Sequence, residues 1–343
     1  MSAPEIHLRS VGTVLPGPPI GNAELARRFH APAVTEQWID SFVGTRQRHF
    51  AVDLETGEVR YSLADLAETA GRRALAAAGL RPADVDLVVL GTASPDQLMP
   101  ATVNVVADRL GIDRVPTYQL LSGCTGAVQA LDVAYQMMRG GRHRLALVLG
   151  AESCAKHLDP TADMTGRTPA EQINGMLFGD GAGALLLSAE PGPGATVVRH
   201  VHLQLAGLGR APGQVVEWRG MADRPLAGPA VVEDYKAVEA SVPELAAEAL
   251  AELLDELGWK DTELDYLLPP QLSGRMTERI MARLGLVGVG EISLVADIGN
   301  TGNALPFFQL EAALPRMVAG DRLIGIAIES SKWIKAGFAL EKN

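Results

Sequence analysis

The segment SGCTGA at residues 122–127 combines a cysteine with two glycines and two hydroxyl side chains. Its Cys124 lies just before AVQALDVAYQMMRGG, residues 127–141, whose apolar spacing is that of a helix. Unpaired N–H groups and the positive end of the dipole at a helix N-terminus favour a thiolate. Gly123 and Gly126 let the backbone turn sharply and approach a ligand. Cys124 is therefore a candidate nucleophile, with a small buried cysteine as the alternative.

Segments with strand and helix patterns alternate through the chain. In the first half, helical spacing alternates with apolar strand-length runs at 60–80, 86–94, 101–112, 117–123, 127–141 and 144–153. In the second half, the same order returns at 244–259, 264–270, 275–286, 291–300, 304–320 and 321–331. This alternation predicts a layered α/β fold.

Short motifs recur between the two halves at a nearly constant distance. GCTGA at residue 123 returns as GNTGN at residue 299, so that Asn300 takes the position of Cys124. Glu152-Ser153 returns as Glu329-Ser330, and RLG recurs as well. Such spacing indicates duplicated halves. If they pack about a pseudo-twofold axis, Cys124 and Asn300 each lie at a strand-to-helix junction and face one central cleft.

Several motifs together resemble β-ketoacyl-acyl-carrier-protein synthase III of the thiolase superfamily. They are VGTVLPGPPIGNAELARRF (11–29), EQWIDSFVGTRQRHF (36–50), SGCTGAVQAL, GMLFGDGAGALLLS (175–188) and GNTGNALP (299–306). The resemblance implies two duplicated βαβαβαββ halves, 1–190 and 191–343, in a five-layer α-β-α-β-α arrangement. It also implies that Cys124 accepts an acyl group and that Asn300 is catalytic.

The chain departs from the family pattern at the end of the second-half strand. The family has Pro-His-Gln there, whereas this chain reads LLPPQ with Pro270 at the histidine position. That histidine and the asparagine hold the thioester oxygen of malonyl-carrier protein while carbon dioxide leaves. Proline has no N–H and no polar side chain, so it cannot donate a hydrogen bond that holds the thioester oxygen or stabilises the enolate. Loss of one such donor costs about 3 kcal/mol of transition-state stabilisation.

Other departures lie near the substrate. Ser330, Ser331 and Lys332 stand at about the positions of a family glycine run that helps to form the oxyanion hole. Phe42 replaces an arginine that grips coenzyme A, and the segment 159–176 is longer than in the family. In GMLFGDGAGALLLS, FGDGAG does not fit a nucleotide-binding loop, and the resemblance implies a structural turn.

The resemblance and the sequence neighbourhood suggest a set of substrate-binding residues. These are Trp38, Met99, Phe178, Gln271, Ser273 and Ser331. Trp38 matches the tryptophan of the adenine-contacting stretch. Met99 matches a residue that reaches into the partner's acyl pocket, which implies a homodimer. A carrier protein with an acidic surface would need a basic patch, for which the candidates are Arg46, Arg48, Arg275 and Arg279.

The histidines do not supply an obvious replacement at Pro270. His200 and His202 alternate along an expected strand and therefore share a face, where a solvated pair is a better interpretation than a metal site. His49 is expected to be structural or to face a ligand, and His157 is a weak candidate for a base. Cys154 is most simply a packed strand-end residue. We therefore expect neither a metal nor a cofactor.

Composition excludes several classes of function. The net charge of −11 and the lack of a Lys/Arg run argue against nucleic acid or an anionic membrane as a partner. The first residues lack the pattern of a signal peptide, and no apolar run is long enough to span a bilayer. Two cysteines do not make a disulfide framework, which favours the cytoplasm.

These observations predict an acyltransferase that does not decarboxylate its substrate. Cys124 would take an acyl group from an acyl-carrier-protein or coenzyme A thioester and pass it to a small-molecule hydroxyl or amine, or to a carrier thiol. The resemblance implies such a role in antibiotic biosynthesis. The alternatives are a decarboxylating synthase with a relocated acid/base, an acyl-thioester hydrolase, and a catalytically weakened subunit that shapes a partner's pocket.

Overall fold

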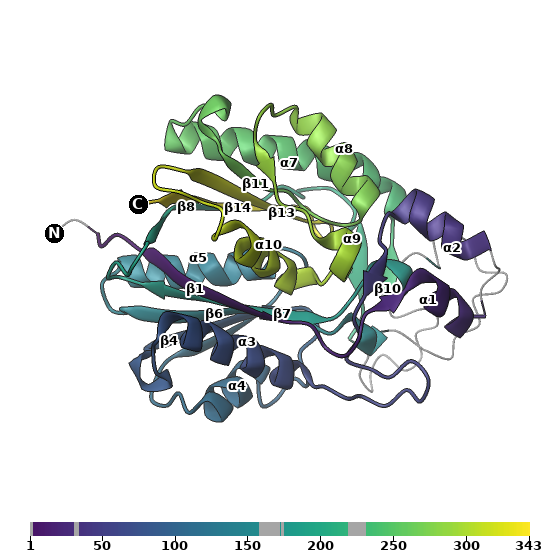
Figure 1. Cartoon of the computed structure of the whole chain (residues 1–343), viewed down its shortest axis with the longest axis horizontal. Coiled ribbons are helices and arrows are strands. Elements are labelled where there is room, and N and C mark those ends of the chain that lie inside the picture. The colour runs from purple at the N-terminus through teal and green to yellow at the C-terminus, as the bar shows by residue number, and fades with distance from the viewer. Residues whose placement is uncertain (1–2, 31–33, 158–171, 173–174, 219–230) are drawn as a thin grey trace.

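The structure is a computed structural model that describes residues 3–30, 34–157, 172, 175–218 and 231–343. Figure 1 shows helices and sheets stacked in alternating layers. Ten strands follow one another in the order β12-β11-β13-β14-β8-β1-β7-β6-β4-β5. The two central strands, β8 and β1, pair over only two residue pairs, His7 with Val197 and Leu8 with Thr196. The ten strands therefore form two five-stranded sheets that are joined by these two residue pairs.

The first sheet is built from the first half of the chain. Its strands are β1 (His7–Val14), β4 (Leu87–Thr92), β5 (Thr117–Leu121), β6 (Leu145–Glu152) and β7 (Gly181–Ser188). β4 is parallel to β5 and β6, whereas β7 is antiparallel to β6 and β1. β4, β6 and β7 are buried along their whole length, as expected for strands covered on both faces.

The second sheet repeats this arrangement with strands of the second half. They are β8 (Thr196–Leu205), β11 (Tyr266–Leu268), β12 (Gly290–Glu291), β13 (Arg322–Glu329) and β14 (Ile334–Lys342). β11 is parallel to β12 and β13, and β14 is antiparallel to β13 and β8. The strand order in each sheet, counted outward from the junction of β1 and β8, is the same.

Helices occupy the remaining three layers. α3 (Leu63–Ala78) and α4 (Thr102–Leu110) cover the outer face of the first sheet, and α7 (Tyr235–Leu257) and α8 (Gly274–Leu284) cover the outer face of the second. α5 (Gly126–Arg139) and α10 (Leu305–Ala313) lie between the sheets and share one apolar core with strands of both. The expected five-layer arrangement is confirmed.

The remaining elements are short and lie near the ends of the sheets. They are β2 (Ile20–Gly21), α1 (Asn22–Arg28), α2 (Val34–Trp38), η1 (Ile39–Val43), β3 (Gln47–Arg48), η2 (Pro82–Asp84), η3 (Cys154–His157), β9 (Gln214–Val216), β10 (Val231–Glu233), η5 (Asp261–Glu263), α9 (Val295–Ile298) and η6 (Gly302–Ala304). Among the described residues, no helix is both long and apolar enough to cross a bilayer.

One sequence prediction about these elements is wrong. Residues 291–300 were expected to form a strand, but β12 ends at Glu291 and α9 follows. The side-chain Oε1 of Gln271 accepts hydrogen bonds from the backbone N–H groups of Leu294 and Val295, both at 2.8 Å. Those groups are therefore not free to pair with a strand. Asn300 consequently follows a short helix, whereas Cys124 follows a strand as expected.

The predicted boundary between the halves at residues 190 and 191 falls in the connection between β7 and β8. Nothing in the fold tests whether either half is an independent unit. The segment 159–176, expected to be longer than in the family, lies mostly outside the described residues.

Candidate active site

Cys124 lies in the connection between β5 and α5, beside a cavity that is also lined by Asn300. The cavity is small, about 30 Å³, which is room for about one or two water molecules. Pro269 and Pro270, at the end of β11, line it as well. The two junctions that the sequence repeat relates are therefore brought to one central cavity, as their spacing predicted.

Four side chains around this cavity carry polar groups, but two of them are already occupied. They are Cys124, Asn300, Gln271 and Gln309. Gln271 donates through Nε2 to the carbonyl of Ile292 and accepts two backbone hydrogen bonds through Oε1. Gln309 donates to the carbonyls of Pro269 and Ile292. Gln271 was proposed as a substrate-binding residue, but both ends of its amide are used to hold the loop after β12.

Asn300 has a different pattern of contacts. Its Oδ1 accepts a hydrogen bond from the backbone N–H of Gly302 at 3.0 Å, so the Nδ2 end is the free donor. Among the described residues Nδ2 has no hydrogen-bond partner. Backbone hydrogen bonds from Asn300 to Leu177 and from Gly179 to Asn300 fix the loop against the segment that contains Phe178. Asn300 is therefore held to present an N–H donor.

The carboxylate of Glu329, at the end of β13, packs against the segment that holds the cysteine. Its Oε2 accepts hydrogen bonds from Ser122 Oγ at 2.7 Å and from Thr125 Oγ1 at 2.6 Å, and a longer one from the N–H of Thr125. A Cβ on Gly123 would lie 3.2 Å from Glu329 Cδ, so any side chain there would press against this carboxylate. The second half of the chain thus binds the N-terminus of the nucleophile helix.

Glu152, at the equivalent end of β6, makes the reciprocal contact with the second half. Its Oε2 accepts from Asn303 Nδ2 at 2.8 Å, and its carboxylate also accepts from Ser94 Oγ and the N–H of Ala93. Asn303 in turn accepts from the N–H of Ala127 at 2.9 Å and donates to the carbonyl of Ser122 at 3.0 Å. Asn303 therefore ties the two junctions together.

These carboxylates change the chemistry of the cysteine. Burial raises the pKa of Cys124 to about 12, and the negative charges of Glu329, Glu152 and Glu233 add to the shift. The expectation that the helix N-terminus would favour the thiolate is therefore wrong for the resting protein. The carboxylate of Glu329 already occupies the place at the helix N-terminus where the dipole favours an anion. Burial also raises the pKa of Cys154.

The FGDGAG turn beside the site is structural, as the resemblance implied. Asp180 is fully buried and accepts hydrogen bonds from the N–H groups of Ala51 at 2.6 Å and Ala155 at 3.0 Å. Phe178 precedes it and packs with the apolar cluster of α1 and η1. His49 contacts the carbonyls of Pro16 and Gly17 through Nδ1. These contacts hold the loops around the site.

The two serines that were proposed to bind substrate both have internal partners. Ser273 is the N-cap of α8, where its Oγ accepts from the N–H of Met276 at 3.1 Å, and it is buried. Ser331 donates its hydroxyl proton to Oε1 of Glu329. Ser273 is thus a helix cap, and Ser331 belongs to the network around the nucleophile segment.

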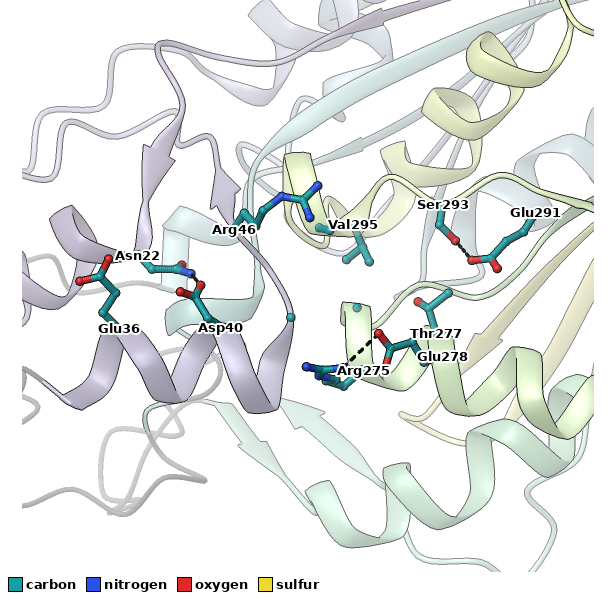
Figure 2. A pocket seen from close by; sticks show the side chains of 13 residues that line it. Asn22, Glu36, Asp40, Arg46, Arg275, Thr277, Glu278, Glu291, Ser293 and Val295 are labelled. Carbon is teal, nitrogen blue, oxygen red and sulfur yellow. Dashed lines mark hydrogen bonds and ion pairs between the residues drawn. The ribbon is translucent and has the colours of Figure 1, made fainter.

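A larger cleft of about 680 Å³ lies between η1 and the start of α8 (Figure 2). Its lining includes four carboxylates and two arginines. These residues are Glu36, Asp40, Glu278, Glu291, Arg46 and Arg275. Trp38, which precedes η1, stacks on Phe42 with ring centroids 6.3 Å apart, and Phe42 is 66% exposed. An aromatic pair therefore stands where the family has an arginine.

The expected basic patch does not form as proposed. Arg48 is fully buried and donates to Asn22 Oδ1 at 2.6 Å and to the carbonyl of Met176, so it is unavailable to a partner. The other three arginines are exposed but paired. Arg46 contacts Asp297, Arg275 contacts Glu278, and Arg279 contacts Glu239. Met99 is 87% exposed, and its place in a partner's acyl pocket stays a prediction. The side chain of His157 lies outside the described part of the structure.

Sequence reasoning missed Glu152, Glu329 and Asn303 as the residues that hold the site. A signal for them was present, because Glu-Ser recurs at the two equivalent strand ends and Asn303 falls three residues after Asn300 as Ala127 does after Cys124. The repeat revealed equivalent positions, but not that each glutamate reaches the opposite half.

Known proteins resemble this chain over nearly its whole length. Residues 118–207 match the family described as 3-Oxoacyl-[acyl-carrier-protein (ACP)] synthase III. A β-ketoacyl-[acyl-carrier-protein] synthase III from Rhodospirillum centenum is 34% identical over 310 residues, covering 89% of this chain and 90% of the relative.

Solved structures extend this similarity. "AbyA1 - tetronic acid condensing enzyme" is 56% identical, with a TM-score of 0.94 and coverage of 98% of this chain and 99% of that one. The priming β-ketosynthase of the R1128 polyketide pathway is 26% identical, with a TM-score of 0.82 over 99% and 97% of the two chains.

Proposed function

The chain belongs to the β-ketoacyl-[acyl-carrier-protein] synthase III family, and we propose that it is a member that transfers an acyl group without decarboxylation. Cys124 takes the acyl group from a thioester, and Asn300 donates a hydrogen bond to a carbonyl oxygen in the cavity. In net terms, the thiol and the donor thioester give the acyl-cysteine and a free donor thiol. The acyl-cysteine is neutral, so it avoids the charge repulsion that disfavours the thiolate.

One observation supports this proposal above the others. Around the cavity, Asn300 is the lining amide whose nitrogen makes no hydrogen bond among the described residues, whereas those of Gln271 and Gln309 are held by backbone carbonyls and Pro270 offers no donor. Stabilising the enolate left by carbon dioxide loss requires donors at the thioester oxygen, and each missing donor costs about 3 kcal/mol, or roughly a hundredfold or more in rate. An acceptor that is already activated does not need the second donor.

The similarity to a tetronic acid condensing enzyme suggests which acceptor this is. A tetronic acid ring joins two acyl units through one carbon–carbon bond and one ester bond. The carbon that forms the new bond lies between two carbonyl groups in a β-ketoacyl thioester. Such a carbon loses a proton readily because both carbonyls share the charge. We therefore infer a β-ketoacyl thioester as acceptor and an α-hydroxyacyl group on Cys124.

The bonds of this reaction balance without a co-reactant. The acceptor carbon loses its proton and attacks the acyl carbonyl. The carbon–carbon bond forms as the carbon–sulfur bond of the acyl-cysteine breaks, and the released proton returns Cys124 to the thiol. The α-hydroxyl of the transferred unit then attacks the acceptor thioester, closes the ring and releases the carrier thiol. No carbon dioxide is formed, and the role matches the expected place in antibiotic biosynthesis.

The larger cleft is unfavourable for the nucleotide of coenzyme A. Its four carboxylates outnumber its two arginines, and Arg46 and Arg275 are each paired with a carboxylate. The phosphates of a coenzyme A nucleotide would meet this negative lining, with Phe42 in place of the family's arginine. A pantetheine arm attached to a carrier brings only its own phosphate. We therefore expect acyl-coenzyme A to load Cys124 slowly, and a carrier with an acidic surface to dock outside this cleft.

Intact-protein mass spectrometry tests the proposal. The purified chain is incubated with α-hydroxyacyl-carrier protein and then with a β-ketoacyl thioester, and carbon dioxide release from malonyl-carrier protein is measured in parallel. We expect an adduct on the wild type that is absent from Cys124→Ala, followed by ring formation. Asn300→Ala should still be acylated but transfer about a hundredfold more slowly.

Three outcomes would overturn parts of this assignment. If the wild type forms no acyl adduct, the proposal that Cys124 is acylated is wrong. Carbon dioxide release as fast as transfer favours a decarboxylating synthase. Loss of the adduct to water in the presence of the acceptor, without ring formation, favours the hydrolase.

A further inference from the structure

Two histidines of β8 and two glutamates of α7 meet on the outer face of the second sheet. His200 Nε2 lies 2.7 Å from Glu256 Oε2, and His202 Nδ1 lies 3.3 Å from the same oxygen. His202 Nε2 lies 3.1 Å from Glu252 Oε2. The ligand atoms of His200, His202 and Glu256 all lie within 4.8 Å of one another. This group is distinct from the cavity that contains Cys124.

The sequence favoured a solvated histidine pair at this place, but the structure buries one of the two rings. The side chain of His202 is 8% exposed, and that of His200 is 36% exposed. His202 Nε2 and Glu252 Oε2 are both buried and lie 3.1 Å apart, but they are not aligned for a hydrogen bond, and neither atom makes one within the described structure. A buried ring nitrogen and a buried carboxylate oxygen without a hydrogen bond are costly unless something fixes the ring's proton.

The charges around the group leave a deficit of positive charge. Glu248, Glu252 and Glu256 follow one another at four-residue spacing on α7 and face the sheet. Lys335 of β14 is 4% exposed and contacts Glu248 at 3.3 Å and Glu252 at 2.6 Å. With neutral histidines, three carboxylates therefore face one ammonium. A divalent cation would compensate the remaining two negative charges.

We propose that His200, His202 and Glu256 bind a divalent transition-metal ion, for which Zn²⁺ is the best match. Imidazole nitrogen and carboxylate oxygen are the ligands that zinc prefers, at about 2.0–2.2 Å, and tetrahedral coordination then spaces the ligand atoms by roughly 3.3 Å. The separation of His202 Nδ1 and Glu256 Oε2 matches that spacing. His200 and Glu256 need to separate by about half an ångström, and both side chains are exposed enough to move.

Glu252 has a separate role in this site. When His202 binds the metal through Nδ1, its Nε2 must carry the proton, and a small rotation of the ring or of the carboxylate would aim that proton at Glu252 Oε2, 3.1 Å away. A carboxylate that accepts from the second nitrogen of a metal-bound histidine fixes the ring and raises its basicity. Metal binding would thus supply the proton arrangement that the two buried atoms need. The fourth coordination position is open to water on the exposed side.

Binding of Zn²⁺ to the purified full-length protein tests the site. The protein is stripped with a chelator, and Zn²⁺ is titrated in competition with a chromophoric indicator. Co²⁺ is used separately, because its visible absorption reports tetrahedral coordination. We expect one ion per chain, a rise in melting temperature with Zn²⁺, and a tetrahedral Co²⁺ spectrum. His200→Asn and Glu256→Gln should each weaken binding at least tenfold, and Glu252→Gln should weaken it by about ten- to a hundredfold.

Glu248→Gln is the matched control, because it removes the same charge from the same helix face without removing a ligand. Because Glu248 contributes to the charge that the cation compensates, its loss should weaken Zn²⁺ binding, but clearly less than loss of the ligand Glu256. The proposal fails if the stripped wild type binds no stoichiometric Zn²⁺, or if Glu248→Gln weakens binding as much as Glu256→Gln does. If a variant of the buried His202 does not fold, His200→Asn still tests the site, because His200 is partly exposed.

Discussion

At the scale of single residues, Cys124 competes with Glu329 for the N-terminus of α5. The dipole and the free N–H groups there stabilise one anion well, and the carboxylate of Glu329 already accepts from Thr125. A thiolate beside that carboxylate is disfavoured, so the resting cysteine is a thiol with its pKa raised to about 12.

Glu329→Gln should lower the pKa of Cys124, because it removes the largest of the charges that raise it while keeping an amide that can still accept and donate hydrogen bonds. Each unit of decrease raises the thiolate population about tenfold at a fixed pH below the pKa. The rate of alkylation by iodoacetamide, measured from pH 7 to 10, reports this change. Glu190→Gln, an exposed carboxylate paired with Arg144, should leave the profile unchanged. Equal profiles for the wild type and Glu329→Gln would contradict the charge argument.

At the scale of elements, the site depends on contacts that cross between the halves. Asn303 is fully buried and connects the first turn of α5, the carbonyl of Ser122 and the carboxylate of Glu152. Asn303→Ala leaves the N–H of Ala127 and the carboxylate of Glu152 with one partner fewer. Each buried group left unsatisfied costs about 1–3 kcal/mol.

We therefore expect Asn303→Ala to lower the free energy of unfolding by a few kcal/mol and to slow acylation of Cys124. Urea denaturation and mass spectrometry measure the two effects. The control is Asn104→Ala, which removes an exposed amide whose one side-chain hydrogen bond among the described residues comes from Thr117, and which should change stability by less than about 0.5 kcal/mol. If both variants lower the free energy of unfolding equally, the hydrogen bonds of Asn303 between the halves do not contribute more to stability than an exposed amide does.

Asp180 gives the turn beside the site a pH dependence. Burial raises the pKa of its carboxyl to about 7 from 3.8, so between these values the folded protein holds a proton that the unfolded chain releases. Stability from this group is therefore greatest at low pH and falls as pH rises toward 7. In Asp180→Asn, an NH₂ group faces a backbone N–H, so the free energy of unfolding should fall by about 1–3 kcal/mol. Urea midpoints should show this deficit at pH 5 and a smaller one at pH 8; a deficit that widens with pH would contradict the raised pKa.

Much of the architecture could be predicted from sequence because it follows from local patterns. Alternating apolar periods gave the layers, and the repeated GCTGA and GNTGN segments related Cys124 to Asn300. The ionisation of Cys124 could not be predicted, because it depends on carboxylates that lie about 200 residues away in sequence from the thiol or at the end of another strand. The burial of Arg48 could not be predicted for the same reason, because its hydrogen-bond partners Asn22 and Met176 lie in separate segments of the chain.

At the scale of the whole molecule, the sheets end in edges that differ in character. β12 is only two residues long, whereas β5 at the opposite edge has five residues. Tyr118 and Leu121 of β5 are 41% and 70% exposed, and Leu98 and Met99 in the connection between β4 and α4 are 60% and 87% exposed. An unpaired edge strand with apolar side chains is a surface that proteins usually cover.

We therefore expect the protein to be a homodimer in which β5 faces the partner, and Leu121→Lys to weaken it. A lysine on the edge strand brings a charge that must be desolvated in the interface, and two-fold symmetry brings two of them together. Light scattering during gel filtration at micromolar concentration should show the wild type as a dimer and the variant shifted toward monomer. Val287→Lys, which changes a 92% exposed valine after α8, should remain a dimer. A monomeric wild type, or a Leu121→Lys variant that stays dimeric, would place any partner on another face and remove the reason to expect Met99 in a neighbour's acyl pocket.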